Sequence, residues 1–422
     1  MRTNPSVRPA SAQSPPPRIR VLVVAGNFAP EVTGIGKYVG EMTQWLAEAG
    51  VEVRVVTAPP HYPAWQVAPG YSAWLYKVEQ HSGARVYRCP LLVPRSPCGM
   101  KRLLLMLSFA LSTLPVMLWQ ALTWRPRLVF VVEPPLACAP AALLAARLCS
   151  AKSWLHVQDF EVDAAFDLGL LRNEGLRRLA CGFERWLLRH FDQASSISPA
   201  MLKKLADKGV TAQSIRYFPN WVDCELIRPL GGPNPLREEL GIGSATAVLL
   251  YSGNMGEKQG LSLLVEVARE FAATPDVLLL LCGDGAAKQR TMDAARDLAN
   301  VRFLPLQPLA RLNELLNLAD VHLLPQRAEA EDLVMPSKLT AIMASGKPVV
   351  ASARPGSDVA TAAVAGGLVV APGDAEAFGA AIRQLLADAA LRTRLGESAR
   401  RHAAANWDRD AVMRALLADI EK

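Results

Sequence analysis

Short apolar segments, each long enough for one buried strand, alternate with helical segments along nearly the whole chain. In the first half these segments are residues 20–26, 51–57, 84–88, 128–132, 154–157 and 194–197. The pattern begins again with residues 247–251, 277–282, 301–304, 321–324, 348–351 and 368–370. Strands that alternate with helices form parallel sheets covered on both faces. The sequence therefore predicts an α/β protein with two doubly wound, Rossmann-like domains.

A stretch rich in proline and glycine, residues 228–235, separates the two halves. We expect an N-terminal domain at 19–223, a linker at 224–240 and a C-terminal domain at 241–405. Residues 1–18 are rich in Pro, Ser and Arg without an apolar core, which predicts a disordered tail rather than a signal peptide. Ligands of such sheets bind beyond the carboxyl ends of the strands, so the expected site is a cleft between the domains.

The charge and the cysteine and histidine content limit which kinds of molecule this chain is expected to bind. Lys and Arg number 46 against 39 Asp and Glu, and this net charge of +7 is too mild to favour nucleic acid. The positive charge is concentrated, because residues 1–30 and 80–132 contain basic side chains and no acid. Such segments are either solvated faces or faces toward an anionic surface or substrate. The 7 cysteines and 6 histidines form no metal-like cluster, so we expect reduced thiols and no bound metal.

Residues 103–124 carry no charge and are long enough to span a bilayer, which takes about 20 residues. Polar residues interrupt this run, however, and it lies between two strand-like segments, 84–88 and 128–133. We therefore expect a surface helix of a βαβ unit, with a true span as the alternative. Lys101, Arg102, Arg125 and Arg127 flank the helix. This pattern predicts peripheral attachment to the anionic inner face of the cytoplasmic membrane, against the alternative that the helix is buried in its own domain.

Glycine-rich loops join strands to helices, and glycine lets backbone N–H groups approach an anionic ligand there. The first loop holds Gly34 and Gly36; the second holds Gly253, Asn254, Gly256 and Lys258; Gly283 ends a third strand. None matches G-x-G-x-x-G or a P-loop, so a dinucleotide fold is not favoured. We interpret the first two as phosphate-binding loops, with ordinary turns as the alternative.

A second group of candidates combines a cation with polar side chains. Ser337 and Lys338 open a helix after Pro336, and a helix N-terminus with a hydroxyl and a lysine suits a diphosphate. Glu331 and Asp332, just upstream, could meet sugar hydroxyls. The alternative is an ordinary surface helix start.

A third group follows one strand of the first half. His156 lies near the carboxyl end of that strand, and Asp159 and Glu161 come directly after it. We expect a functional histidine here, against the alternative of a structural one. In contrast, we interpret Asp408 and Asp410 as helix caps rather than as a metal-binding D-x-D.

In their order along the chain, these segments resemble glycosyltransferase family 4. The resemblance rests on Phe28-Ala29-Pro30, Gly34-Ile35-Gly36, His156 with Asp159, Pro219-Asn220, Gly253–Gly260, Pro336-Ser337-Lys338 and Gly346–Val350. Within the family, GIGKY, TAPPHYP, LHVQDFEVDA and GNMGEKQGL are most similar to the colanic acid biosynthesis fucosyltransferase group.

The resemblance implies a retaining enzyme of the GT-B fold, with two Rossmann-like domains facing a cleft and residues 406–422 as a helix that crosses back. It implies a nucleotide-sugar donor, GDP-fucose being one candidate, a lipid-linked oligosaccharide acceptor in exopolysaccharide biosynthesis, and no cofactor or metal. The implied catalytic residues are His156, Lys258 and Lys338. Donor-binding roles fall to Gly34, Gly36, Gly253, Asn254, Gly256, Gly283, Glu331, Asp332 and Ser337, and acceptor-side roles to Asp159 and Glu161.

The chain departs from the family at two places. Asn254 stands where the family has an arginine, and the family's E-x7-E glutamates correspond to Leu333 and Ala341. Two other functions remain open from sequence: a nucleotide-sugar epimerase of similar architecture and a non-catalytic sugar binder.

Overall fold

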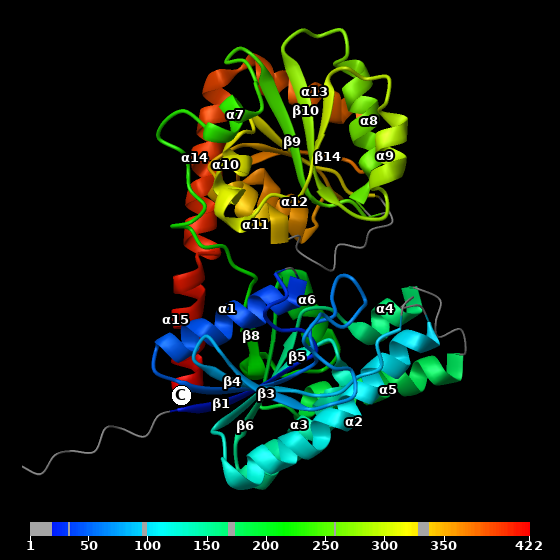
Figure 1. Cartoon of the computed structure of the whole chain (residues 1–422), viewed down its shortest axis with the longest axis vertical. Helices are drawn as coiled ribbons and strands as arrows, with labels where there is room; N and C mark the ends of the chain where they lie inside the picture. The colour runs from blue at the N-terminus through cyan, green and yellow to red at the C-terminus, as the bar shows by residue number, and fades with distance from the viewer. Residues whose placement is uncertain (1–18, 33, 95–98, 168–173, 257–258, 328–336) are drawn as a thin grey trace, which may run out of the picture.

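The computed structural model contains two α/β domains, one above the other, with chain connections along one side (Figure 1). It describes residues 19–32, 34–94, 99–167, 174–256, 259–327 and 337–422. The predicted fold class is confirmed, because each domain is a sheet of mainly parallel strands with helices on both faces.

The N-terminal sheet has eight strands in the order β3-β4-β2-β1-β5-β6-β7-β8. Their bounds are β1 Arg20–Ala25, β2 Glu52–Thr57, β3 Lys77–His81, β4 Ala84–Arg88, β5 Leu128–Glu133, β6 Lys152–Val157, β7 Gln193–Ser196 and β8 Ile215–Tyr217. The inner strands are the predicted apolar segments. Two strands were not predicted: β3 is a polar, largely exposed edge strand antiparallel to β4, and β8 has only three residues.

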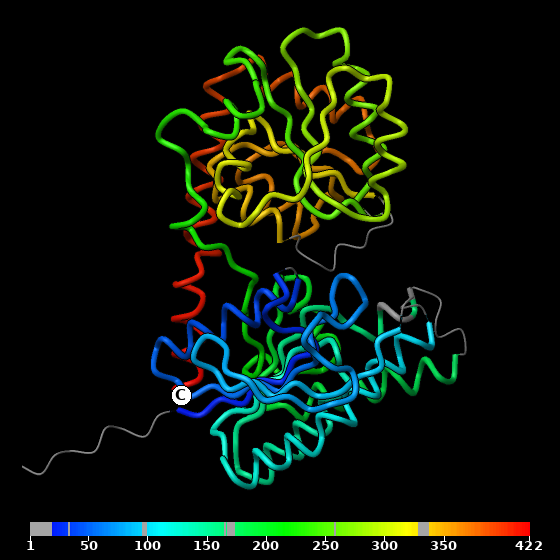
Figure 2. Tube along the Cα trace, viewed as in Figure 1, coloured from blue at the N-terminus to red at the C-terminus, as the bar shows by residue number. Residues whose placement is uncertain are grey.

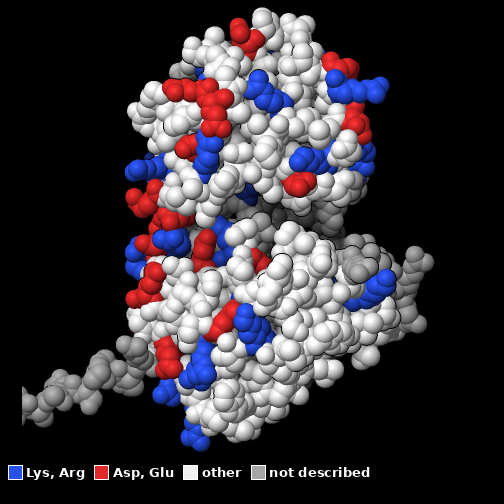
Figure 3. Space-filling model, viewed as in Figure 1, with Lys and Arg blue, Asp and Glu red and all other residues white. Residues whose placement is uncertain are grey.

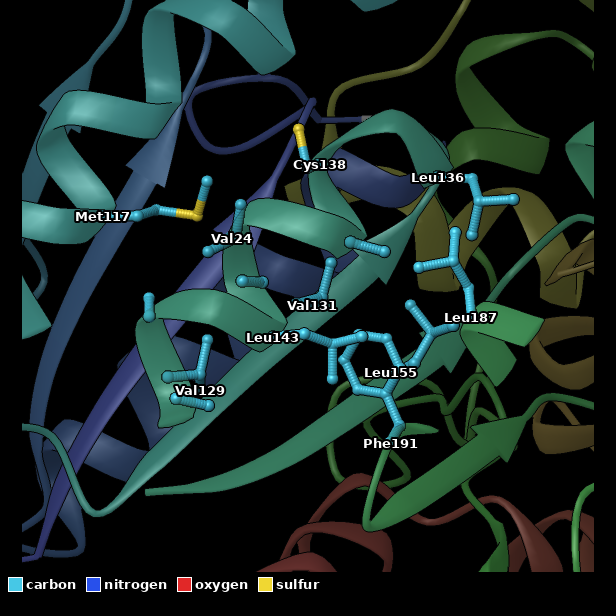
Figure 4. Packing of buried hydrophobic residues seen from close by; sticks show 14 of the residues in the cluster. Val24, Met117, Val129, Val131, Leu136, Cys138, Leu143, Leu155, Leu187 and Phe191 are labelled. Atoms are coloured by element: carbon cyan, nitrogen blue, oxygen red, sulfur yellow. The ribbon is translucent and has the colours of Figure 1, made fainter. Parts of the chain in front are cut away.

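Alternate residues of β1 face opposite layers of helices. Leu22 and Val24 pack in one cluster with α2 (Met100–Thr123), α3 (Ala139–Cys149), α5 (Glu174–His190) and α6 (Pro199–Asp207). Figure 4 shows Met117 and Leu143 reaching this cluster from α2 and α3. Val21 and Val23 pack instead against α1 (Gly34–Glu48) and α15 (Arg409–Glu421). The remaining helical elements of this domain are η1 Leu136–Cys138, α4 Glu161–Asp167 and η2 Ala212–Ser214.

The C-terminal sheet has six parallel strands in the order β11-β10-β9-β12-β13-β14. The strands are β9 Ala247–Asn254, β10 Val277–Asp284, β11 Val301–Leu304, β12 Val321–Leu324, β13 Val349–Ser352 and β14 Gly367–Val370. The helices are α7 Pro235–Glu239, α8 Leu261–Glu270, α9 Lys288–Ala294, α10 Leu312–Asn317 with η4 Leu309–Arg311, α11 Ser337–Ala344, α12 Asp358–Val364, α13 Ala375–Ala387 and α14 Ala389–Asn406.

The chain passes between the domains twice, and the two passages are paired. The backbone N–H of Val222 donates to Trp407 O at 2.9 Å, and that of Arg409 donates to Val222 O at 2.9 Å. Beyond this bridge, α15 packs on the N-terminal core, while α14 belongs to the C-terminal domain (Figure 2). Asp408 accepts the Ala411 N–H as the N-cap of α15, so its prediction as a cap is confirmed. The same prediction for Asp410 is wrong, because Asp410 lies in the first turn of α15 and accepts Trp45 Nε1 at 3.2 Å.

Among the described residues, α2 is the helix long and apolar enough to cross a membrane. It connects β4 to β5 within one sheet and packs along α3, which confirms the prediction of a surface helix in a βαβ unit. The six cysteines in the described ranges are all free thiols.

A close approach between β9 and β10 gives a stability prediction. Gly283 pairs with Gly253, and a Cβ at position 283 would lie 1.9 Å from Gly253 O. We expect Gly283→Ala to lower the free energy of unfolding of the C-terminal domain by about 1–3 kcal/mol, because this overpacks a buried strand pair. Gly232→Ala, where a Cβ meets nothing within 4 Å, is the control. Urea unfolding of both variants checks this, and equal midpoints would contradict it.

Candidate functional site

The carboxyl ends of the two sheets lie opposite each other. The Ala200 N–H in the first turn of α6 donates to Asp358 at the start of α12, at 2.8 Å. Nearby, the Tyr38 side chain of α1 lies close enough to Ser337, the first residue of α11, for the serine to lower the pKa of the phenol, although burial raises that pKa more. Each of these helices starts just beyond the carboxyl end of a strand. Contacts between their N-terminal turns therefore place the carboxyl edges of the two sheets face to face, where ligands of such sheets bind.

Lys338 is the central cation on the C-terminal side. Its Nζ donates to the Gln259 side chain, lies 3.3 Å from the Tyr251 hydroxyl and sits 4.6 Å from the centre of the Tyr251 ring. Burial lowers the pKa of Lys338 to about 7, and no acid among the described residues offsets this effect. Because the partners of this lysine are neutral, an anion that binds beside it would stabilise its charged form.

The loop after β9 supplies the partners of Lys338. Tyr251, near the end of that strand, is buried, and its hydroxyl donates to Asn254 O at 2.6 Å. Asn254 is exposed and Gly256 half-buried, while Gly283 closes the neighbouring strand against Gly253. Sequence alone left open whether Lys258 or Gln259 takes the place of the family's lysine in this loop, and Gln259 is the residue of the loop that contacts Lys338. Lys258, Glu331 and Asp332 lie outside the described residues.

Across the cleft, the predicted G-x-G loop opens α1. Gly34 is exposed with a φ of 59°, whereas Gly36 is buried. A Cβ at position 36 would lie 2.8 Å from the Glu31 side chain. Glycine at this position therefore allows the Glu31 carboxylate to pack against the helix, and Gly36 is not part of an open ligand-binding loop. Gly34 remains the glycine that presents backbone to the cleft.

Glu31 joins two loops of the N-terminal domain. Its Oε1 accepts the backbone N–H groups of His61 at 2.8 Å and Tyr62 at 2.9 Å, and its Oε2 accepts Asn27 Nδ2 at 2.8 Å. A carboxylate that accepts several N–H groups is a strong, charge-assisted anchor. Sequence inspection did not identify Glu31, although it is the first acid of the chain and lies between Pro30 and the glycines.

His156 lies inside the N-terminal domain instead of on the cleft surface. It is 3% exposed and stacked among Phe130 and Phe218. Its Nδ1 is 2.9 Å from Ser195 Oγ, and its Nε2 is 3.0 Å from Gln158 Nε2. Since the Gln158 amide nitrogen can only donate, His156 Nε2 accepts and the ring proton sits on Nδ1. Burial lowers the pKa of His156 to about 3, so the ring is neutral.

The catalytic role predicted for His156 stays a prediction, and the structure shows which residues surround the ring. Gln158 and Asn220 form a reciprocal amide pair at 3.0 and 3.2 Å, at the carboxyl edge of the sheet. His156 contacts that pair through the Gln158 amide. Asn220 belongs to one of the matching segments, but Gln158 was missed, although it is the first residue after β6.

The two predicted acceptor-side acids behave differently. Asp159 is half-buried just beyond β6. Glu161 turns inward, where its Oε2 accepts the Leu136 N–H at 2.5 Å. Burial raises the pKa of Glu161 to about 7, and the neighbouring Glu133, fully buried, also has a raised pKa through burial. Instead of an open acceptor contact, Glu161 is an inward-facing carboxyl that holds the loop after β5.

Comparisons with known proteins come from both sequence and structure. Residues 33–221 match the glycosyl transferase 4-like domain, and residues 234–402 match the glycosyl transferases group 1. The chain is 40% identical to WcaI of Escherichia coli K12, whose name assigns it to colanic acid biosynthesis as a glycosyl transferase, over 95% of this chain and 100% of that one.

Two solved structures show the same fold. The sucrose-phosphate synthase of Thermosynechococcus elongatus has a TM-score of 0.74 at 20% identity, covering 94% of this chain and 97% of that one. Anabaena HepE, in complex with UDP and glucose, has a TM-score of 0.68 at 14% identity, covering 96% of this chain and 100% of that one.

The environment of Lys338 predicts an unusual titration. With a free-site pKa of about 7, Lys338 should lose its proton as the pH rises through neutrality, and an anion that binds the protonated form should raise that midpoint. Affinity for the anion should then fall above pH 7 by up to about tenfold per pH unit. Competitive acetylation read by mass spectrometry, with and without inorganic pyrophosphate, measures the midpoint. A midpoint near 10 that pyrophosphate leaves unchanged would contradict this assignment.

Proposed function

We propose that this chain transfers a sugar from a nucleotide donor to a lipid-linked oligosaccharide. The chain belongs to the group 1 glycosyl transferases and is an enzyme with the GT-B fold. The pathway is the biosynthesis of an exopolysaccharide of the colanic acid type, in line with 40% identity to WcaI over nearly both full lengths. GDP-fucose is the first donor to test. The observation that carries the proposal is Lys338, a half-buried cation without an acidic partner among the described residues, at an interdomain edge.

Lys338 and the N-terminal turn of α11 would stabilise the departing nucleoside diphosphate. Negative charge develops on the leaving phosphate as its bond to the sugar breaks, and a lysine with aligned backbone N–H groups stabilises that charge. Gln259 and Tyr251 hold the ammonium in place until the diphosphate arrives. We propose that these groups act without a metal ion.

The proposed route retains the configuration of the sugar. The bond from the anomeric carbon to the phosphate oxygen breaks, and the acceptor oxygen bonds to the same carbon from the same face. The acceptor proton passes to the leaving phosphate. This route needs no pair of catalytic carboxylates of the kind that glycosidases use, and the inward orientation of Glu161 agrees with that.

A donor panel tests the proposal. GDP- and UDP-sugars are incubated with the full chain, with and without membrane lipid extract and EDTA, and nucleoside diphosphate and labelled glycolipid are measured. We expect release that depends on lipid extract and survives EDTA, and about 10²–10³-fold slower turnover for Lys338→Ala. Lys152→Ala, at the amino end of β6, is the matched control. An isomerised donor without acceptor would indicate an epimerase and overturn the proposal.

We also infer that α2 rests on the inner face of the cytoplasmic membrane. The buried side of the helix combines the apolar Phe109 and Met117 with polar groups. Ser108 Oγ accepts the Leu92 N–H, and Gln120 Oε1 accepts from Arg54. Its leucines face outward, with Leu111 71% exposed and Leu104 49% exposed. A helix on a water-exposed surface normally has the opposite arrangement, whereas a lipid surface favours this one.

The neighbouring helices extend the apolar surface. Leu144 and Leu148 of α3 and Leu179, Phe183 and Trp186 of α5 are also exposed. Basic residues accompany them, including exposed Arg147, Arg178, Arg185 and Arg189. The region occupied by α2 in Figure 1 is nearly free of charged side chains in Figure 3. An apolar face bordered by arginines complements an anionic leaflet.

Sedimentation with liposomes tests this orientation. We expect binding to anionic vesicles, partial release at high salt, and about tenfold or greater weakening in the double variant Leu104→Glu, Leu107→Glu, because it places charge on the lipid-facing side. The double variant Leu306→Glu, Leu309→Glu puts the same charge on exposed leucines of the C-terminal domain and serves as the control. Equal sedimentation of both double variants would contradict the inference.

A further inference from the structure

The connection between β2 and β3 presents two aromatic side chains beside the G-x-G loop. Tyr62 is 39% exposed, and a methyl group at Gly34 would lie 3.7 Å from its Cε1. The Trp65 ring meets the Tyr62 ring edge to face at 5.9 Å and 86°. The loop rises from the N-terminal domain toward the C-terminal one (Figure 1). We propose that Tyr62 and Trp65 form a platform on which a pyranose ring of the acceptor packs, and so determine acceptor specificity.

Two buried charges hold this platform in place from beneath. Glu31 accepts the backbone N–H of Tyr62 itself at 2.9 Å and that of the preceding residue. Arg88, at the end of β4 and 1% exposed, donates to Ala29 O in one loop and, at 3.1 Å, to Ala58 O in the other. The loop that carries the aromatic rings is therefore fixed to the loop that precedes Gly34, which removes much of the entropy cost of binding.

The backbone of the platform is strained. Trp65 has a φ of 52°, in the left-handed region that a bulky residue rarely adopts, at a cost of about 1–3 kcal/mol. The side chain gains no deep burial in return, because it is only half-buried. Strain that core packing does not explain is common at ligand-binding positions.

The chemistry of the platform fits a sugar. An aromatic face offers a large apolar area at a small cost in side-chain entropy, and the C–H face of a pyranose packs on it while hydroxyls remain free for hydrogen bonds. The platform lies on the N-terminal side, across from Lys338, which leaves it to the acceptor rather than to the donor diphosphate. This inference rests on the proposed transferase function.

Saturation-transfer NMR tests the platform without turnover. The probes are the methyl glycosides of glucose, galactose and fucose, added to the full chain with GDP or UDP. We expect transfer to the ring protons of at least one glycoside in the parent, retained in Tyr62→Phe and lost in Tyr62→Ala. Trp74→Ala, an exposed tryptophan in the same connection, should keep the signal. No transfer to any glycoside in the parent, or full transfer in Tyr62→Ala, would overturn the proposal.

Kinetics separate this proposal from the transferase function. We expect Tyr62→Ala to raise the KM for acceptor lipid about tenfold, the effect of losing one good aromatic contact, with unchanged donor hydrolysis in the absence of lipid. Glu31→Gln should raise the same KM while nucleoside diphosphate binding is retained. An unchanged acceptor KM in Tyr62→Ala with normal transfer would contradict the platform proposal and leave the transferase function standing. Absence of transfer in the parent, with glycoside binding intact, would contradict the transferase function and leave the platform standing.

Discussion

The two backbone hydrogen bonds that join Val222 to residues 407 and 409 determine how the halves of the site meet. They join the segment that leaves the N-terminal domain, at Val222, to the segment that returns to it, at residues 407–409. Asp223 and Arg409 add an ion pair at 2.8 Å, and Trp221 beside them donates to Glu41 of α1 at 2.7 Å. Both passages are therefore joined at one point between the domains. The cation Lys338 belongs to one domain, and the loop that carries Tyr62 and Trp65 belongs to the other.

The fold could be predicted well from the sequence because the inner strands of a parallel sheet are continuous apolar runs bounded by turns. The same reasoning missed β3, whose KVEQH sequence is that of an exposed edge, and the short β8. Site residues divide in a similar way. Lys338 was identified because it follows Pro336 and Ser337 at a predicted helix start, although its partners Tyr251 and Gln259 lie 87 and 79 residues away. Glu31 and Gln158 were missed because their roles depend on partners 30 and 62 residues away. His156 is still within β6, and since helices cover both faces of this sheet, its side chain is buried beside Phe130.

Burial, rather than residue type alone, decides how the ionisable groups of this enzyme behave. Arg88 and Glu31 are enclosed, yet each has several polar partners through which it joins loops. Glu133 and Glu161 lack that compensation, and burial raises the pKa of both. Lys338 is an intermediate case, with neutral partners that leave its charge available to a ligand. Polar groups on the buried side of α2 are likewise paired with the domain, since Ser108 Oγ accepts the Leu92 N–H, Ser112 Oγ donates to Pro90 O and Gln120 Oε1 accepts from Arg54.

Helix α15 has a consequence for how the protein is made. Val412, Met413, Leu416 and Ile420 complete the core around Tyr38 and Val21, but they leave the ribosome only after the whole second domain has been synthesised. At roughly 5–20 residues per second, the first domain waits on the order of tens of seconds with part of its apolar surface uncovered. Synthesis order and folding order are therefore different in this chain. The first domain to emerge is completed last, when α15 packs on its core.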